Sequence, residues 1–205
     1  MPVAKGMGRT LTIGQRSRRY LLRHTFSGAS LTPSDQGPSL TTVSGTPSVA
    51  GGVLTKVGAT NLEVRAHGLA ANITYQAKFN FGASAGANRR MLLRARQDAS
   101  TGDNRFQLTI NRVAGQLVLA RVDSGTPTTI GSVSVTINNS TDYWLRWVMR
   151  GSTHEVLFST DGVSFASQIV VTDTAYMAQM SIGAFVIDDA ASPTATIDDL
   201  LVWTP

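Results

Sequence analysis

The feature that most constrains this chain is an alternation of apolar and polar residues with a period of two, which begins near residue 62. The clearest example is the segment 106–111, FQLTIN, in which every second residue is apolar. Successive side chains of a β-strand point to opposite faces, so this pattern predicts strands with one buried and one wet face. The same pattern or shorter apolar runs predict strands at 62–66, 75–81, 91–96, 117–122, 132–137, 143–150, 155–159, 181–187 and 197–203.

Turn-forming residues separate these segments, as in Ala114-Gly115 and Asp161-Gly162, because glycine adopts positive φ at little cost. No amphipathic helix of about 11 residues accompanies them. Ten or more strands without helices predict an all-β sandwich of two antiparallel sheets, and 205 residues fit one such domain. Residues 27–52 are rich in Gly, Ser, Thr and Pro and are expected to be irregular, with one or two short edge strands.

Composition excludes several kinds of chemistry. The chain has no cysteine, so it has no disulfide, thiolate zinc site, iron–sulfur cluster or thiol nucleophile. Its three histidines, His24, His67 and His154, are far apart in the sequence, and its only glutamates are Glu63 and Glu155. No run of about 18 apolar residues suggests a membrane span. We therefore expect a protein without a cofactor and without a membrane span.

The positive charge is concentrated at the beginning of the chain. Residues 1–24 contain six Lys and Arg and no acid, whereas the other 12 basic and 13 acidic residues sum to −1. Glycines at 6, 8 and 14 disfavour a helix, so we expect an extended basic arm at 1–24 and a folded domain at 25–205. Such an arm suits an acidic protein, nucleic acid or an anionic membrane. The residues expected to dock on a partner are Arg9, Arg16, Arg18, Arg19, Arg23, Leu21 and Phe26.

A polar sheet face is the candidate ligand surface. Its predicted members lie at alternating positions of the expected strands: Lys78, Asn80, Arg94, Arg96, Gln107, Thr109 and Asn111. Trp144 alternates away from Tyr143, Leu145 and Trp147, so it is the candidate for stacking on a sugar ring. The alternative interpretations are a core tryptophan and a solvated sheet surface or protein contact.

Acidic residues give little support to catalysis. A retaining glycosidase needs two carboxyl groups about 5 Å apart. The nearest pairs here, Asp188-Asp189 and Asp198-Asp199, are adjacent in sequence, so on a strand they would point to opposite faces. We expect no catalytic residues and no metal site. Calcium binding near Asp198 and Asp199 stays an alternative, because carboxylate oxygens are ligands that calcium prefers.

Several segments, in their order along the chain, resemble one known family. They are HTFSG at 24–28, VSG at 43–45, VAGGVL at 49–54, YWLRW at 143–147, STDGVSF at 159–165 and IDDLLVW at 197–203. The chain resembles the concanavalin A-like lectin/glucanase jelly roll, in the LamG-like form common in bacterial and phage surface proteins. It departs from the family at His24, where Asp is frequent, and at Leu40, where Trp is frequent.

The resemblance and the basic arm together suggest a function. We expect a non-catalytic virion structural protein of a tailed bacteriophage, either a capsid decoration or a tail or baseplate accessory protein. Residues 1–24 would anchor it to other virion proteins, and a homo-oligomeric jelly roll would stabilise the shell or adhere to a host-surface glycan. Nucleic acid is a disfavoured partner. The alternatives are a soluble carbohydrate-binding module and, less favoured, an enzyme acting on polysaccharide.

Overall fold

A computed structural model describes residues 20–205 except 29, 32–34, 58–59, 84–87 and 189–193. The described residues form fifteen strands and no helix. The strands are β1 (Tyr20–His24), β2 (Thr41–Ser44), β3 (Thr46–Ala50), β4 (Val53–Val57), β5 (Leu62–Ala66), β6 (Ile73–Asn80), β7 (Arg89–Gln97), β8 (Arg105–Asn111), β9 (Gln116–Asp123), β10 (Thr126–Ser134), β11 (Asp142–Arg150), β12 (Thr153–Ser159), β13 (Ala166–Thr172), β14 (Ser181–Asp188) and β15 (Thr196–Trp203).

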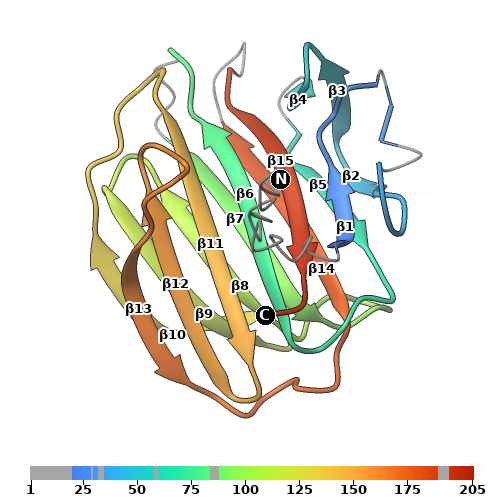
Figure 1. Cartoon of the computed structure of the whole chain (residues 1–205), viewed down its shortest axis with the longest axis vertical. Helices are drawn as coiled ribbons and strands as arrows, with labels where there is room; N and C mark the ends of the chain where they lie inside the picture. Colours follow the sequence, from blue (N-terminus) through green and yellow to red (C-terminus); the bar gives the residue numbers. More distant parts are fainter. Residues whose placement is uncertain (1–19, 29, 32–34, 58–59, 84–87, 189–193) are drawn as a thin grey trace, which may run out of the picture.

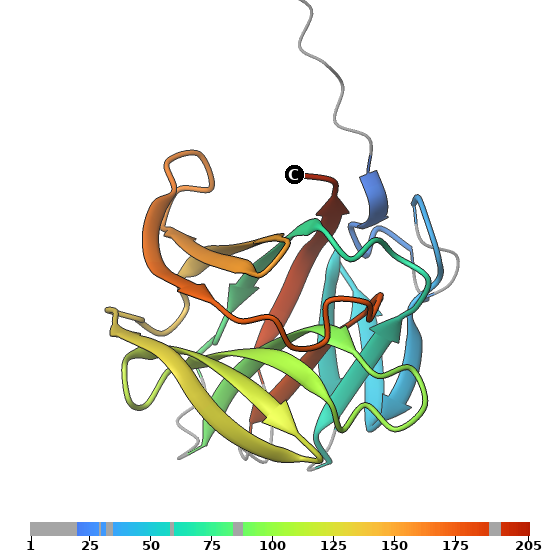
Figure 2. The same cartoon turned by 90° about the horizontal axis from the view of Figure 1, so that it is seen from below.

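The strands form two antiparallel sheets. Sheet A has the order β13-β12-β11-β6-β15-β4-β3, with β1 also paired to β15. Sheet B has the order β10-β9-β8-β7-β14-β5-β2. Figure 2 shows the two sheets as separate layers, with β1, β12 and β13 in one layer and β8, β9 and β10 in the other. This arrangement confirms the all-β sandwich expected from the period-two pattern.

The core lies between the sheets and is filled by the inward-facing half of each strand. In β11, Tyr143, Leu145 and Trp147 are buried, and the residues between them face outward. Tyr143 stacks on Phe79 of the neighbouring strand β6, with ring centroids 5.7 Å apart. The hydroxyl of Tyr75 donates a hydrogen bond across the core to the Gly183 carbonyl of sheet B. Core side chains therefore contact each other both between neighbouring strands of one sheet and between the two sheets.

The two sheets meet along one side of the sandwich, where the edge strands β10 and β13 contact each other (Figure 1). A Cβ on Gly131 of β10 would lie 2.6 Å from the Ile169 side chain of β13, so glycine permits this close approach. On the other side the edge strands are β2 and β3. These lie within residues 27–52, which confirms the expectation of short edge strands there.

Four strands differ from the sequence prediction by more than a few residues, and one of them, β4, was not predicted. β10 spans 126–134 and not 132–137, because Ser124-Gly125 alone forms the turn, with positive φ at both residues. β13 was not predicted either, since its pattern of burial is irregular where its register with β12 shifts. β1 spans 20–24, so only its last residue belongs to the segment 24–28 that carries the family resemblance, and the chain turns at Phe26, which has φ of 52°.

The position of β1 also corrects the boundary between arm and domain. β1 pairs with the last strand, β15, so the sandwich includes residues from Tyr20 and does not begin at 25. Phe26 is fully buried in the core, so it does not offer the apolar docking surface that we expected, whereas Leu21 is partly buried and its docking role stays a prediction. Arg23 is exposed. The remaining predicted docking residues, Arg9, Arg16, Arg18 and Arg19, lie outside the described residues.

Candidate functional site

The predicted ligand face is wrong as a single surface, because its members belong to different sheets. Lys78, Asn80 and Trp144 lie on β6 and β11 of sheet A. The other predicted members lie on β7 and β8 of sheet B: Arg94, Arg96, Gln107, Thr109 and Asn111. A period of two shows which residues of a strand share a face, but it does not show which strands share a sheet.

Arg96 departs further from the prediction, since its side chain does not lie on a sheet face. Its φ is 46°, and the register of β7 with β14 shifts next to it, as in a β-bulge. The guanidinium donates from Nε to the carbonyl of Ala71 at 3.2 Å and from Nη2 to that of Gly151 at 2.6 Å. Arg96 is 2% exposed. Its two hydrogen bonds hold the loop at Ala71 and the turn at Gly151 together at one end of the sandwich.

Strand register brings the three sheet A residues together on the outer face of that sheet. Trp144 on β11 lies opposite Lys78 on β6, and Lys78 lies opposite Asp198 on β15. One row further along, Asp142 lies opposite Asn80. We call these five residues the Trp144 cluster.

Polar contacts within the Trp144 cluster centre on Asp142. Lys78 Nζ lies 3.0 Å from Asp142 Oδ2 and 3.7 Å from Asp198 Oδ2. Asn80 donates from Nδ2 to Asp142 Oδ1 at 2.7 Å, and its own Oδ1 accepts the backbone N–H of Gly82. These side chains are fixed by one another and still reach solvent, since those of Lys78, Asp142 and Asp198 are 26%, 43% and 21% exposed.

The pKa shifts in the Trp144 cluster follow from these contacts. The hydrogen bond to Asp142 raises the pKa of Lys78, so this amine stays protonated. Burial alone would raise the pKa of Asp142, but hydrogen bonds from Asn80 and Lys78 hold it below its usual value. Burial and the adjacent charge of Asp199 raise the pKa of Asp198. The site therefore offers a fixed cation and fixed carboxylate oxygens side by side.

The Trp144 indole is held in place from two sides. Lys78 Nζ lies 5.6 Å from the ring centroid. The turn after β12 lies against the ring, since a Cβ on Gly162 would be 2.9 Å from Trp144 Cε2. Asp161 fixes this turn by accepting the backbone N–H groups of Val163 and Ser164, both at 2.8 Å. Trp144 remains half-buried and so keeps part of its indole in contact with solvent.

Further aromatic groups continue along the same face. The Arg146 guanidinium lies 3.7 Å from the ring centroid of Phe165 and 5.7 Å from that of Trp203. It donates two hydrogen bonds to Gln76 Oε1, at 3.0 and 2.9 Å. Trp203 in turn packs edge-on against Tyr20 of β1. The outer face of sheet A therefore combines aromatic rings with fixed polar groups over several strands.

Sequence reasoning missed Asp142 as a site residue and considered Asp198 only for a metal. Asp142 comes before the apolar alternation of β11, so it was not included in the predicted strand. Its position could have identified it: Asp142 stands two residues before Trp144, and residues two apart on a strand face the same side. Asp199 has φ of 50°, and the register with β6 shifts there, so the rule of opposite faces does not apply to Asp198 and Asp199.

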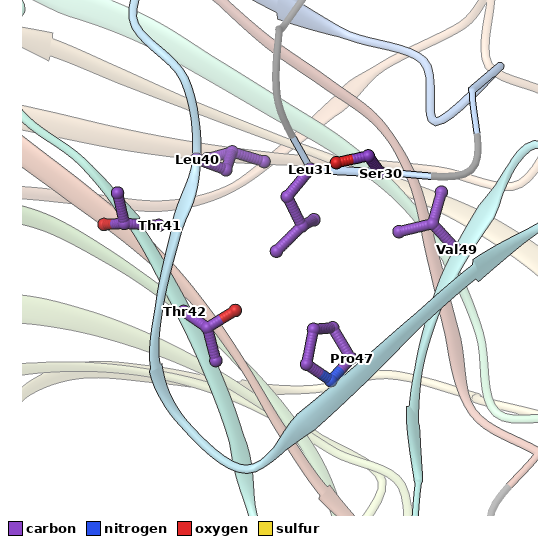
Figure 3. Close-up of a pocket in the computed structure, with 7 residues that line it drawn as sticks. All are labelled: Ser30, Leu31, Leu40, Thr41, Thr42, Pro47 and Val49. Atoms are coloured by element: carbon purple, nitrogen blue, oxygen red, sulfur yellow. The ribbon is translucent and has the colours of Figure 1, made fainter.

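Two hollows lie away from the Trp144 cluster. The first, of about 430 Å³, lies next to edge strands β2 and β3 and is lined by Ser30, Leu31, Leu40, Thr41, Thr42, Pro47 and Val49 (Figure 3). The second, of about 480 Å³, is lined by Ala70, Ala71, Asn72, Arg150, Thr204 and Pro205. The lining of neither includes an aromatic ring, and that of the first includes no charged group. Their chemistry suits a specific polar ligand less well than the Trp144 cluster does.

Other candidate chemistry finds limited support. His67 Nδ1 lies 2.8 Å from Ser181 Oγ, but within the described residues no carboxylate is hydrogen-bonded to His67, as a catalytic triad requires. In the same part of the chain, no group of three or more His, Asp or Glu is arranged to hold a metal ion. No helix of the described residues is long and apolar enough to cross a membrane.

Of the comparisons with known proteins, the one with solved structures agrees with this fold. No protein-family model and no curated protein sequence matches the chain. Among solved structures, carbohydrate-binding module CBM66 from Bacillus subtilis is 16% identical, with a TM-score of 0.63 over 80% of this chain and 95% of that one. The exoplasmic/lumenal domain of VIP36, in a Ca²⁺/Man-bound form, is 10% identical, with a TM-score of 0.68 over 89% of each chain.

A third structure is that of a mutant of the GH43 protein BlXynB from Bacillus licheniformis. It is 13% identical, with a TM-score of 0.67 over 89% of this chain, which spans 39% of that protein. At these identities the likeness concerns the fold alone. The chain has the jelly-roll sandwich fold of these structures, which is the fold implied by the resemblance in its sequence.

Proposed function

We propose that this chain is a non-catalytic carbohydrate-binding domain that holds a sugar on the outer face of sheet A, at the Trp144 cluster. This was the alternative interpretation at the sequence level. The observation that carries it is the position of a half-buried indole beside a fixed set of donors and acceptors. Two structural neighbours support it, since one is a carbohydrate-binding module and another contains mannose.

The chemistry of the cluster matches that of a sugar. One face of a pyranose is a patch of C–H groups that packs on an aromatic ring, and its edge carries hydroxyls that both donate and accept hydrogen bonds. Trp144 offers the ring, Lys78 donates, and Asp142 and Asp198 accept. Because these groups already hold one another in place, little side-chain entropy is lost when a ligand binds.

Binding to a glycan array tests the proposal. Trp144→Ala is expected to lower affinity roughly tenfold or more, because loss of a buried stacking surface costs about 1.5 kcal/mol or more. Trp144→Phe keeps a smaller ring and is expected to retain part of the binding. Thr129→Ala, at an exposed position on β10 of sheet B, is the control and should bind like the unaltered protein.

The outcomes separate the alternatives clearly. Equal glycan binding by the unaltered protein and Trp144→Ala would place the site elsewhere. Hydrolysis of a bound oligosaccharide by the unaltered protein would contradict the non-catalytic part of the proposal and favour the enzyme alternative.

The virion role expected from the sequence stays a prediction. Its main argument is the basic arm, and residues 1–19 lie outside the described residues. A carbohydrate-binding domain is compatible with display on a virion, and the virion location, the partner proteins and the oligomeric state stay predictions from the sequence.

A further inference from the structure

At one place on the outer face of sheet B, arginines outnumber carboxylates. Arg65 on β5 and Arg94 on β7 pair with one carboxylate, Glu63 on β5, and Arg105 on β8 lies near enough for the charges of all three to affect it. We call these four residues the arginine cluster. They lie on the opposite side of the sandwich from the Trp144 cluster, because they belong to the other sheet.

Glu63 is shared by two of the arginines. Arg65 Nε and Arg94 Nη1 each lie 2.7 Å from the same oxygen, Glu63 Oε1. The side chains are nearly dry, with 10%, 11% and 6% exposure for Arg65, Arg94 and Glu63. β14 lies between their two strands, and Gly183, its residue opposite both Arg94 and Arg65, has no side chain to separate them. One carboxylate thus meets two guanidinium groups.

Arg105 adds a third cation that is held by neutral groups. Its Nη1 donates to the carbonyl of Gly102 at 2.5 Å, and its Nε and Nη2 donate to Gln107 Oε1 at 3.4 and 3.3 Å. Within the described residues, no carboxylate lies within ion-pair distance of Arg105. Two of its three guanidinium nitrogens, Nε and Nη2, therefore make long hydrogen bonds that a better acceptor could replace.

Charges near Arg105 make its cationic form costly. Burial, and then the charges of Arg94 and Arg65, lower the pKa of Arg105 to about 10, against the opposite effect of Glu63 and Asp103. The group still stays charged at neutral pH. An anion placed beside it would offset the repulsion among the three guanidinium groups.

We propose that the outer face of sheet B around Arg94 and Arg105 binds an oxyanion, namely a carboxylate or sulfate group. The planar fork of a guanidinium matches two oxygens of either group. Arg105 and Gln107 are half-exposed and form the accessible rim, whereas Arg94 lies deeper. Gln107 also donates to Thr109 Oγ1 at 3.3 Å, so the rim is held in a defined orientation. The site is separate from the proposed sugar site.

NMR of the intact protein tests the proposal directly. The arginine Nε–Hε signals are followed while sodium sulfate is added at constant ionic strength, with sodium chloride as the balancing salt. The Arg105 and Arg94 signals are expected to shift and saturate with sulfate. Parallel titrations with glucuronate and with neutral glucose distinguish a carboxylate source from a sulfate source and from the sugar ring itself.

Variants identify the residue responsible. Arg105→Gln is expected to weaken sulfate binding roughly tenfold or more, since a charge-assisted hydrogen bond contributes about 1.5–3 kcal/mol. Arg150→Gln removes an exposed arginine at the far end of β11 and serves as the matched control. Circular dichroism checks that both variants fold. If Arg105→Gln does not fold, the signals of the unaltered protein still locate the binding.

Two results would overturn the proposal: shifts that grow linearly with sulfate, and saturable binding that Arg105→Gln leaves unchanged. The sugar site is judged separately. Trp144→Ala should leave the sulfate response unchanged, and Arg105→Gln should leave binding of neutral glycans unchanged. Failure of one site is therefore distinguishable from failure of the other.

Discussion

Single residues show where the sequence was informative and where it was not. Trp144 was predictable as an outward side chain, because its neighbours on β11 alternate regularly and no bulge interrupts them. Arg96 was not, because a positive φ next to a register shift turns its side chain out of the alternation. His154 shows a third case: neighbouring residues predicted a strand, but nothing in the sequence indicated a histidine that is 0% exposed.

His154 makes stability depend on pH. Burial between the sheets, and then the charge of Arg96, lower its pKa from 6.5 to about 4, against a smaller opposite effect of Asp173. The unfolded chain therefore binds a proton more readily, so stability is full above pH 6.5 and falls as pH drops to about 4. We expect a loss of about 3 kcal/mol over this interval. Urea unfolding at several pH values measures it.

His154→Leu is the matching variant, since leucine stays neutral at every pH. Its unfolding free energy should vary less with pH between 6.5 and 4 than that of the unaltered protein. His24 and His67 remain in both proteins, so the difference isolates His154. Parallel pH profiles would show that His154 is protonated in the folded protein or does not titrate in this range.

At the level of elements, β1 shows what the sequence could not separate. The basic residues of 1–24 looked like one arm, because charge was the only visible pattern there. In the structure Tyr20–His24 pairs with β15, with Leu22 fully buried and His24 Nε2 donating a hydrogen bond to the Leu31 carbonyl at 3.0 Å. A strand of five residues gives too short an alternation to outweigh a charge pattern.

Two truncations distinguish the arm from the strand. Deletion of residues 1–19 is expected to leave the unfolding free energy within about 1 kcal/mol of the full chain, because it removes none of the sandwich strands described above. Deletion of residues 1–24 should cost about 3 kcal/mol or more, since it removes the fully buried Leu22, and truncating one buried leucine to alanine typically costs about 2–5 kcal/mol. Equal stability of the two truncated proteins would contradict a structural role for β1. Chemical denaturation provides the comparison.

At the scale of the whole molecule, the sequence predicted the sandwich and its many strands but not the assignment of strands to sheets. β6 and β8 have equally regular alternation, yet they lie in different sheets. That assignment depends on contacts between segments far apart in the chain, which local periodicity does not encode. The one expected ligand face therefore became two chemically different faces: the Trp144 cluster on sheet A and the arginine cluster on sheet B.

Two faces separated by the core should act independently. The double variant Trp144→Ala/Arg105→Gln is expected to show the sum of the two single effects on unfolding free energy, within about 0.5 kcal/mol, because the sites share no partner. Urea denaturation of the four proteins completes the cycle. A larger coupling energy would mean that the core transmits a change from one sheet to the other.

The pairing of Tyr20 with Trp203 has a practical consequence. Because the described chain enters sheet A beside the place where its last strand finishes, a tag joined before Tyr20 and a tag joined after Pro205 leave from neighbouring points. Attachment to a sensor chip through either tag would then present the domain in nearly the same orientation. Both attachments would then hide the same surface of the domain, so ligand binding is better measured with the protein free in solution.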